Sequence, residues 1–429
     1  MRLGGRLAAA IEIIEDIDKR HRPAADALKD WGLSHRFAGA GDRAAIGNIV
    51  YDGLRRKRSG SWLFDADTPR AIGFGALLVE WGETPQSLNA ALDGDRFAPA
   101  PLSEAELRLA GDRRSAQAPG TVAADCPDWA APLLEETFGG DWVGEAKALA
   151  ARPPLDLRAN TLKASRQKVV AELQDAGAAA TALAAHGIRI PPIDGAGRHP
   201  NVQAEPAFQK GWFEVQDEGS QVVAELAGAT PGMQVLDFCA GAGGKTLALS
   251  AAMENRGQIF AHDSDKSRIA PIFDRIRRSE SRNIQVVTKP GELAGLAGRM
   301  DVVLVDAPCT GSGTWRRRPD AKWRLTRRQL DARLAEQASI LQEAARFVRP
   351  GGRLVYVTCS VFHEENQWQV AAFLPGNPAF APLDHVSLFE TSLPGKSASA
   401  RIERDAGLLL SPALSHTDGF FFAALRRST

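Results

Sequence analysis

Residues 235–246 read VLDFCAGAGGKT, an apolar strand that runs directly into a glycine-rich turn and then into a helix. Four more apolar segments follow, separated by helical stretches: QIFAH at 258–262, IQVV at 284–287, DVVLVD at 301–306 and RLVYVT at 353–358. Strands that alternate with helices are typical of a doubly wound parallel sheet of the α/β class. Ligands of such sheets bind beyond the carboxyl ends of the strands, so the residues after each strand form the candidate site.

The composition is that of a globular protein. The chain has 429 residues, of which 44% are hydrophobic and 24% charged, and this length suggests more than one domain. Its formal net charge is zero, so nucleic-acid binding requires a local basic surface. The apolar stretch near the N-terminus is interrupted by acidic residues and is too short to span a membrane. We therefore expect a cytoplasmic protein without a membrane partner.

Four cysteines are distributed along the chain: Cys126, Cys239, Cys309 and Cys359. They form no CxxC pair, which argues against a zinc site and against a dense disulfide framework. We expect free thiols in a reducing compartment and no metal. For Cys126 the expected role is that of a small buried apolar residue.

Three segments differ in pattern and predict three domains. Residues 1–111 place apolar side chains such as Leu7 and Ile11 on one helical face, which predicts an all-α domain. After a polar stretch that resembles a linker, residues 120–228 mix short strands with helices and predict a small α/β subdomain. Residues 229–428 contain the five apolar strands and predict a Rossmann-like domain.

The turn after the first strand predicts a nucleoside-containing cofactor. Its glycines allow the backbone to approach a ligand closely. Asp263, at the end of the second strand, can accept two hydrogen bonds from a ribose diol. The same turn partly matches a phosphate-binding P-loop, but Cys239 stands where that motif requires glycine, and no Walker B partner is evident. The turn alone fits several cofactors.

Two cysteines follow neighbouring strands of the expected sheet. The fourth strand ends in DAPCTGSGT at 306–314, and the fifth ends in TCS at 358–360. In a doubly wound sheet the carboxyl ends of these two strands are neighbours over the cofactor cleft. We therefore expect Cys309 and Cys359 to lie close together.

Several ordered motifs resemble the RsmB/Nop/Sun family of RNA 5-methylcytosine methyltransferases. These motifs are VLDFCAGAGGKT, DAPCTGSGTWRRRPD and VYVTCSVFHEEN. The resemblance extends back through GWFEVQDEGSQ at 211–221 and RANTLK at 158–163, and forward to TDGFFF at 417–422, so that it covers about residues 125–428. A second stretch, DRAAIGNIVYDGLRRK at 42–57, resembles the NusB-type domain that bacterial RsmB-like members carry.

Two departures from the family pattern concern the cofactor. The loop reads CAGAGGK where many members have CAAPGGK, which is a conservative change. After the third strand, Pro290-Gly-Glu292 replaces a clear Gly-Asp, so a contact between Glu292 and the adenine side of the cofactor is left open.

The resemblance implies a class I methyltransferase domain preceded by an RNA-recognition subdomain and a NusB-like domain. It implies S-adenosylmethionine as the cofactor, RNA as the partner and a monomer. Small-subunit (16S) ribosomal RNA is the expected substrate, and transfer RNA is an alternative. The implied cofactor contacts are Cys239, Ala240, Gly241, Ala242, Gly243, Gly244, Lys245, Asp263 and Asp306.

The resemblance also assigns catalytic roles. Cys359 is the nucleophile that adds to carbon 6 of cytosine, Asp306 holds the ring nitrogen, and Cys309 assists the breakdown of the adduct. Cysteine suits the first role because its thiolate is strongly nucleophilic. In DNA cytosine-5 methyltransferases the nucleophile follows the fourth strand, which corresponds to Cys309 here, but the additional TCS cysteine favours the RNA assignment. Lys245 has two candidate functional roles, to position Asp306 or to contact the substrate; the alternative is a solvated lysine in the first turn of a helix.

A basic stretch with interleaved tryptophans follows Cys309 and offers the local charge that RNA binding requires. The expected RNA contacts are Arg158, Lys163, Arg316, Arg317, Arg318 and Lys322. The target base has to leave its stack, which favours an unpaired cytidine. Two other classes stay open, a non-catalytic RNA-binding assembly factor and a methyltransferase of proteins or small molecules. The cysteine pair and Asp306 argue against both.

Overall fold

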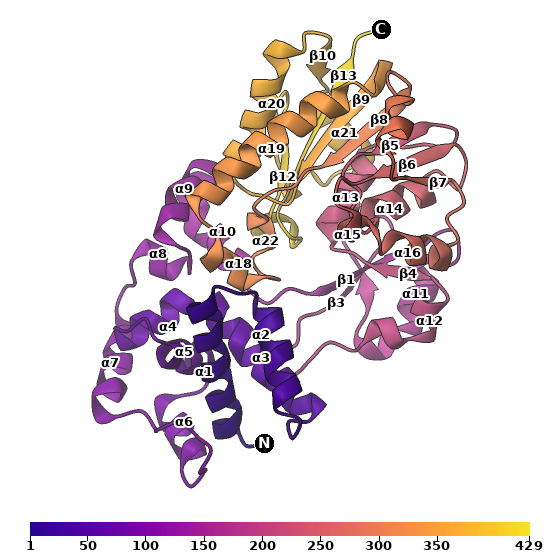
Figure 1. Cartoon of the computed structure of the whole chain (residues 1–429). Coiled ribbons are helices and arrows are strands. Elements are labelled where there is room, and N and C mark those ends of the chain that lie inside the picture. The colour runs from indigo at the N-terminus through magenta and orange to yellow at the C-terminus, as the bar shows by residue number, and fades with distance from the viewer. The chain divides into compact units, whose positions relative to one another are not determined.

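The computed structural model describes residues 1–429, except for the side chain of Pro290. Its contacts divide the chain into two compact units (Figure 1). The helical unit comprises Met1–Pro153, Pro192–His199 and Trp315–Leu325. The sheet unit comprises Pro154–Pro191, Pro200–Thr314 and Thr326–Thr429. Among the helices described, none combines the length and the apolar character that a transmembrane span requires.

Packed helices form the helical unit. They are α1 Leu3–Arg20, α2 Ala24–Ser34, α3 Ala40–Arg55, α4 Lys57–Phe64, α5 Pro69–Val79, α6 Pro85–Leu92, α7 Glu104–Ser115, α8 Gly120–Ala123, α9 Ala131–Phe138, α10 Trp142–Leu149 and α18 Pro319–Arg324. Its core contains Leu7 of α1, Ile46 of α3 and Phe74 of α5, all fully buried. Helices α4 and α5 cross closely, because a Cβ atom at Gly75 would lie 2.4 Å from Cα of Gly60. The expectation of an all-α N-terminal region is confirmed.

The helical unit continues beyond the polar stretch that the sequence suggests as a linker. Helix α7 extends to Ser115, and a capping box between Ser103 and Glu106 begins it. Beyond it, the fully buried Asp125 accepts hydrogen bonds from the backbone nitrogen and the hydroxyl of Ser59, at 2.8 and 2.7 Å. These hydrogen bonds connect α4 with the segment that follows α8. The first strand of the α/β part is at Leu155–Ala159, and the domain boundary near residue 120 stays a prediction.

The segment Trp315–Leu325 is inserted between two strands of the sheet unit in sequence, yet it belongs to the helical unit. The last carbonyl groups of a helix have no partners within the helix. In α3, the Trp323 indole nitrogen donates to the carbonyl of Leu54 at 2.6 Å, and the Lys322 ammonium donates to the carbonyl of Arg55 at 3.4 Å. The Arg55 guanidinium in turn donates to the carbonyl of Arg316 at 2.8 Å. The segment therefore caps α3.

The sheet unit contains a small antiparallel sheet with the strand order β2-β3-β1-β4. Its strands are β1 Leu155–Ala159, β2 Ala179–Ala180, β3 Gly187–Ile190 and β4 Phe213–Val215. Helix α11 begins where the sequence predicts, because the Ser165 hydroxyl accepts from the backbone nitrogen of Lys168 at 3.2 Å. Gly177 ends the helical segment in a left-handed conformation, with a φ of 74°.

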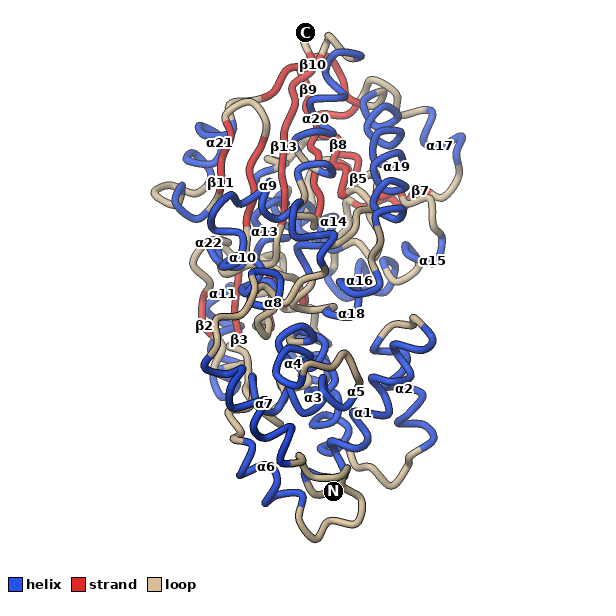
Figure 2. Tube along the Cα trace, turned by 90° about the vertical axis from the view of Figure 1, so that its left-hand side faces the viewer, coloured by secondary structure: helices blue, strands red, loops and turns tan.

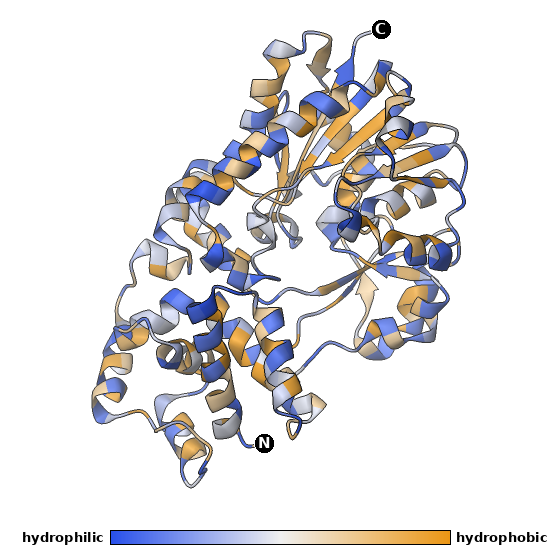
Figure 3. Cartoon of the chain, viewed as in Figure 1, coloured by the Kyte–Doolittle hydropathy of each residue, from blue (hydrophilic) through white to orange (hydrophobic). Residues whose placement is uncertain are grey.

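A nine-stranded sheet forms the rest of this unit, with the order β11-β12-β13-β9-β8-β5-β6-β7 and β10 paired with β13. Figure 2 shows its strands in red, and Figure 3 shows apolar residues along them. The strands are β5 Gln234–Asp237, β6 Gln258–His262, β7 Ile284–Val287, β8 Met300–Asp306, β9 Val348–Thr358, β10 Phe380–Pro382, β11 Arg401–Glu403, β12 Gly407–Leu410 and β13 Phe420–Arg427. The five expected strands, β5 to β9, form its parallel part.

Helices cover the sheets of this unit. They are α11 Arg166–Glu172, α12 Pro206–Gln209, α13 Glu218–Leu226, α14 Gly244–Ala252, α15 Lys266–Ile269, α16 Ile272–Ser279, α17 Pro290–Ala294, α19 Arg327–Ala345, α20 Gln367–Phe373, α21 His385–Ser392 and α22 Pro412–Ser415. The predicted Rossmann-like fold is confirmed. An antiparallel edge of β10 to β13 extends the predicted parallel sheet.

The strand order places the candidate residues together. Strand β5 has β6 on one side and β8 on the other. The strands that follow β5 are therefore added first on one side of it, as β6 and β7, and then on the other side, as β8 and β9. Strand β8 runs parallel to both β5 and β9, which brings the carboxyl ends of these three strands to one edge. Such a switch point is where α/β sheets bind their ligands.

Candidate active site

Cys309 and Cys359 meet at this edge of the sheet. Strand β8 ends at Asp306, which pairs with Val357 near the end of β9, and each cysteine follows its strand by a few residues. Their sulfur atoms are 3.3 Å apart, and both thiols are partly buried. The expectation that the two cysteines lie close together is confirmed.

Burial and the neighbouring thiol both act on Cys309. The contact with Cys359 and burial together raise the pKa of Cys309 well above its ordinary value. The roles of the two cysteines stay a prediction.

Backbone hydrogen bonds fix the two cysteine loops to each other. The amide of Gly313 donates to the carbonyl of Cys359 at 2.9 Å. The hydroxyls of Ser312 and Ser360 are 2.9 Å apart, and the amide of Val361 donates to the Ser312 hydroxyl at 2.9 Å. The distance between the two sulfur atoms is therefore set by buried main-chain and hydroxyl contacts.

Glu365 anchors the same loops, a role that the sequence interpretation missed. This carboxylate is fully buried and accepts from the amide of Thr310 at 2.8 Å, from the Thr310 hydroxyl and from the Gln337 side chain at 3.0 Å. Its backbone carbonyl accepts from the Tyr356 hydroxyl at 2.7 Å. The available signal was the acidic pair after VYVTCS, since an acidic residue is rarely buried without hydrogen-bonding partners.

Lys245 lies against Asp306. Its ammonium is 2.6 Å from the Asp306 carboxylate and 5.2 Å from the centre of the Phe420 ring. The lysine is in the first turn of α14 and is buried, whereas the aspartate side chain is about one third exposed. Of the two roles expected for Lys245, the structure shows the contact with Asp306.

A cavity of about 560 Å³ opens beside the glycine-rich turn. Among its lining residues are Phe238, Cys239, Asp263, Ile269 and Leu293. The Asp263 carboxylate accepts from the amide nitrogens of Gly241 and Asp265, both at 2.9 Å, which fixes its orientation. Polar groups such as Lys266 and Arg268 line the cavity together with its apolar residues, and apolar surface beside an oriented carboxylate fits a nucleoside.

The glycine-rich turn needs glycine at two positions. Gly241 and Gly243 have φ angles of 49° and 83°, and a Cβ atom at Gly243 would lie 2.5 Å from the Ile272 side chain. Of the expected cofactor contacts, Cys239 and Asp263 line the cavity, whereas residues 240–245 and Asp306 do not. Glu292 does not line it either, although Leu293 and Ala294 do. Contact between these other residues and the cofactor stays a prediction.

Comparisons with known proteins agree with this geometry. Residues 226–426 match the family profile for 16S rRNA methyltransferase RsmB/F, and residues 126–192 match the RsmF/B-like methyltransferase ferredoxin-like domain. A probable ribosomal RNA small subunit methyltransferase B from Synechocystis is 34% identical over 314 residues, which are 70% of this chain and 67% of that protein. The chain belongs to the RsmB/F family of methyltransferases.

Other relatives of this RsmB/F-family chain give the same result. The ribosomal RNA small subunit methyltransferase B of Citrobacter koseri is 34% identical over 70% of this chain and 66% of its own length. The chain thus spans about two thirds of the length of the curated relatives it matches.

Solved structures share its fold. That of PH0851 covers 100% of both chains with a TM-score of 0.73 and 25% identity. NSun6 from Pyrococcus horikoshii with SFG covers 71% of this chain and 98% of its own, with a TM-score of 0.60 and 22% identity.

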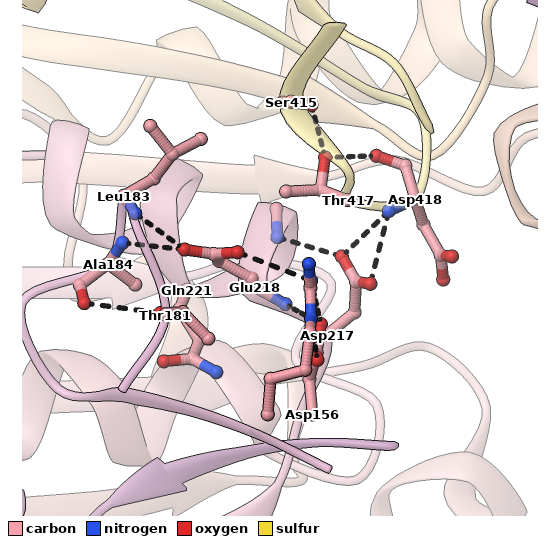
Figure 4. Close-up of polar contacts among 12 residues, drawn as sticks. Asp156, Thr181, Leu183, Ala184, Asp217, Glu218, Gln221, Ser415, Thr417 and Asp418 are labelled. Carbon is pink, nitrogen blue, oxygen red and sulfur yellow. Dashed lines mark hydrogen bonds and ion pairs between the residues drawn. The ribbon is translucent and has the colours of Figure 1, made fainter. Parts of the chain in front are cut away.

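The family motifs at 211–221 and 417–422 meet in the structure of this RsmB/F-family member (Figure 4). The Asp217 carboxylate accepts from the amides of Gly219 and Asp418, at 2.8 and 3.1 Å. Beside it, the buried Glu218 accepts from the amides of Leu183 and Ala184, at 2.7 and 3.1 Å. These acidic residues join α13 to the loop before β13 and to the small sheet.

The structure corrects the expectation of an exposed basic surface. Arg316 and Lys322 are only 4% and 2% exposed, because their segment packs into the helical unit. Burial lowers the pKa of Lys322 to about 8, and its ammonium donates to the carbonyls of Asp125 and Arg55. These contacts give Lys322 a structural role.

The other expected RNA contacts differ in accessibility. Arg318 is exposed and Arg317 half-buried. Lys163 is half-buried and forms an ion pair with Glu280 at 2.5 Å. Arg158 is only 5% exposed. RNA contact by these residues stays a prediction, and the exposed Arg318 is the most accessible of them.

Proposed function

We propose that this RsmB/F-family protein transfers a methyl group from S-adenosylmethionine to carbon 5 of a cytidine in 16S ribosomal RNA. The observation that carries the proposal is the 3.3 Å contact between the Cys309 and Cys359 sulfur atoms at the end of β8 and β9. The family profile and the names of the relatives support ribosomal RNA as the substrate class. A methyltransferase of proteins or small molecules has no need for two cysteines in this position.

S-adenosylmethionine supplies an electrophilic methyl group when it is bound. The cavity beside the glycine-rich turn fits its nucleoside part, with Asp263 placed to accept hydrogen bonds from the ribose hydroxyls. Cys239 lines this cavity, and burial raises its pKa well above the ordinary value, so it contributes a neutral, apolar surface. No charged thiolate competes with the nucleophile there.

The chemistry requires a nucleophile because carbon 5 of cytosine is not reactive enough to accept a methyl group unaided. The Cys359 thiolate adds to carbon 6, and the electron pair of the double bond moves to carbon 5. Carbon 5 then bonds to the methyl group as the methyl–sulfur bond breaks, and the electron pair of that bond leaves with S-adenosylhomocysteine. Asp306, held by Lys245 at 2.6 Å, is proposed to hold the ring nitrogen that gains electron density. The adduct thus makes carbon 5 nucleophilic.

The adduct must then break down. A base removes the proton from carbon 5, the electron pair restores the double bond, and Cys359 leaves as a thiolate. Cys309 suits this step, because the contact that most raises its pKa is the one with the Cys359 thiol. When Cys359 becomes a thioether, it no longer carries a negative charge beside Cys309, so the pKa of Cys309 falls. Cys309 then loses its own proton to solvent, and its thiolate accepts the proton from carbon 5.

The substrate cytidine has to leave its stack to reach Cys359. Unstacking costs a few kcal/mol in a stable duplex and much less in a loop, so we propose an unpaired cytidine as the target. Arg318 and Arg317 follow the Cys309 loop in sequence and are proposed to contact phosphates.

Transfer of labelled methyl groups tests the proposal. The purified protein should incorporate label from S-adenosylmethionine into small-subunit ribosomal RNA from a strain that lacks the gene, and bisulfite sequencing should locate one protected cytidine. Incorporation into transfer RNA instead would change the substrate to the alternative. An absence of incorporation into any RNA, together with RNA binding, would indicate a non-catalytic assembly factor.

A further inference from the structure

Arg158 is a buried cation whose nearest carboxylate, Glu214 on the facing strand β4, favours its charge but forms no contact ion pair with it. Its side chain is on β1 and is only 5% exposed. The Nε atom donates to the Gln216 side-chain carbonyl at 2.7 Å, which is a neutral group. Among the described carboxylates, none lies within ion-pair distance of this guanidinium. Burial lowers the pKa of Arg158 to about 10.

The nearby carboxylates belong to other arginines. Arg189, on the adjacent strand β3, forms bidentate bonds with Asp156 at 2.7 Å and also contacts Glu218 at 3.2 Å. Glu214 is held by two arginines of α16, at 3.0 and 2.5 Å. The ion pairs of Glu214 are thus made with Arg275 and Arg278, and the only side-chain hydrogen bond of Arg158 is with the neutral Gln216. Burying an unpaired charge destabilises a protein, so such a residue points to a ligand.

A cavity of about 530 Å³ lies next to this guanidinium. We call it the Arg158 pocket, and it is lined by Arg158, Thr161, Leu162, Ala184, His186, Gln221, Ala224, Glu225, Ala248, Ala251, Ala252 and Glu254. None of these residues lines the cavity beside the glycine-rich turn, and none is a proposed catalytic residue. It is a separate site of the sheet unit.

The polar groups of the pocket indicate what it binds. Gln221 is 4% exposed; its amide nitrogen donates to the carbonyls of Leu157 and Gln216, at 3.1 and 2.8 Å, whereas its oxygen Oε1 is buried without a partner. The pocket thus presents a guanidinium for an oxyanion and an amide oxygen for a hydrogen-bond donor. Alanines of α13 and α14 also line the pocket and provide an apolar wall suited to a flat ring.

We propose that the Arg158 pocket binds one nucleoside monophosphate unit, with its phosphate at Arg158 and its base at the alanine wall, donating to Gln221 Oε1. His186 and Thr161 at the rim supply further hydrogen bonds to the phosphate. The exposed carboxylates of Glu225 and Glu254 repel additional phosphate groups, which favours a single phosphate. Such a unit occurs within RNA and as a free nucleotide, and the RNA source rests on the proposed function.

Stability separates a ligand-binding role of Arg158 from a structural one. Replacing Arg158 with methionine keeps much of the side-chain volume and removes the unpaired charge, so the melting temperature should stay the same or rise. The matched variant Arg189→Met breaks buried ion pairs and should lower it. If Arg158→Met lowers the melting temperature as much as Arg189→Met does, Arg158 is structural and the proposal fails.

Binding is tested by calorimetry of the full chain with cytidine, uridine, adenosine and guanosine 5′-monophosphates. At least one should bind, and Arg158→Met should weaken it by about tenfold or more, as expected for one charged hydrogen-bonded contact. Gln221→Leu should weaken it too, whereas the exposed Arg282→Met serves as a control and should not. The corresponding triphosphate should bind more weakly than the monophosphate.

Steady-state methylation of RNA then identifies the source of the nucleotide. If Arg158→Met raises KM for RNA and leaves kcat unchanged, the pocket holds a nucleotide of the substrate; if it changes neither but abolishes mononucleotide binding, the ligand is a free nucleotide. Equal behaviour of wild type and Arg158→Met in both assays overturns the proposal. If the wild-type protein binds the mononucleotide but methylates no RNA, the proposed function is refuted, whereas the proposal that the Arg158 pocket binds a nucleotide still holds.

Discussion

Burial changes the chemistry of individual side chains in the sheet unit. Asp237, the last residue of β5, is fully buried; burial raises its pKa to about 7, although the Thr246 hydroxyl donates to it at 2.6 Å and stabilises the charged form. An aspartate in the unfolded chain has its ordinary pKa near 3.8. The folded state therefore binds more protons than the unfolded state between these two values.

This difference predicts that Asp237 lowers stability as the pH rises from about 4 to 7, because the folded state then has to lose its extra proton. Asp237→Asn removes the titration. As the pH rises over this range, the melting temperature of the variant should increase relative to that of wild type. The corresponding difference in unfolding free energy is limited to about 4 kcal/mol. Calorimetry at a series of pH values checks it, and a difference that is independent of pH would contradict the cause given for the shift.

The contact between Lys245 and Asp306 should position Asp306 for catalysis. The Lys245 ammonium holds the Asp306 carboxylate at 2.6 Å, so Lys245→Met leaves Asp306 free to turn away from the substrate. We expect kcat to fall about 100-fold, the typical effect of misplacing a reacting group. Lys245→Arg keeps the charge and should recover part of the rate. Steady-state kinetics with RNA measure kcat for both variants, and an unchanged kcat in Lys245→Met would show that Asp306 needs no such partner.

Among the structural elements, two loops meet where glycine alone fits. A Cβ atom at Gly313 would lie 2.2 Å from the carbonyl oxygen of Gly419, in the loop before β13. Gly313→Ala must therefore separate the Cys309 loop from that loop. We expect a destabilisation of about 1–3 kcal/mol and loss of methyl transfer. In the control Gly295→Ala the new Cβ atom has its nearest neighbour at 3.6 Å, and both properties should be preserved.

The sequence predicts the elements whose pattern is repeated and strongly apolar. Strands β5 to β9 alternate with helices, and this rhythm alone places Cys309 and Cys359 at adjacent strand ends. Other elements lack such a signal. Helix α7 ends in a polar run that resembles a linker. Strand β10 has three residues and forms only by pairing with the distant β13, and β11 is a three-residue strand paired with its neighbour β12. The amino-acid pattern of such a short segment does not predict its pairing with another strand.

At the scale of the whole molecule, the sequence misplaces the basic segment after Cys309. Lys322 reads as a surface residue, but its partners are backbone carbonyls of Arg55 and Asp125, which are far away in the sequence and have no side-chain signature. The same applies to Glu365, whose partners include the amide of Thr310. Buried polar side chains that bind main-chain atoms are therefore the part of the fold and the site that sequence reasoning could not find.

Charge reversal distinguishes the two kinds of basic residue in this segment. Lys322→Glu places a carboxylate beside carbonyl oxygens inside the helical unit and should lower its melting temperature strongly. The exposed Arg318→Glu should leave the melting temperature unchanged, weaken RNA binding and reduce its salt dependence by about one charge. Calorimetry and salt-dependent binding measure the two effects. Unaltered RNA binding in Arg318→Glu would exclude Arg318 from the RNA contacts.

Cys359 and Cys309, whose sulfur atoms are 3.3 Å apart, are proposed to act as nucleophile and base, respectively. These roles are tested most directly by denaturing electrophoresis of the protein incubated with S-adenosylmethionine and substrate RNA. Cys309→Ala should accumulate a covalent protein–RNA adduct, because Cys359 still adds to carbon 6 but its release is blocked. Cys359→Ala should form none. An adduct in Cys359→Ala, attached through Cys309, would contradict these roles.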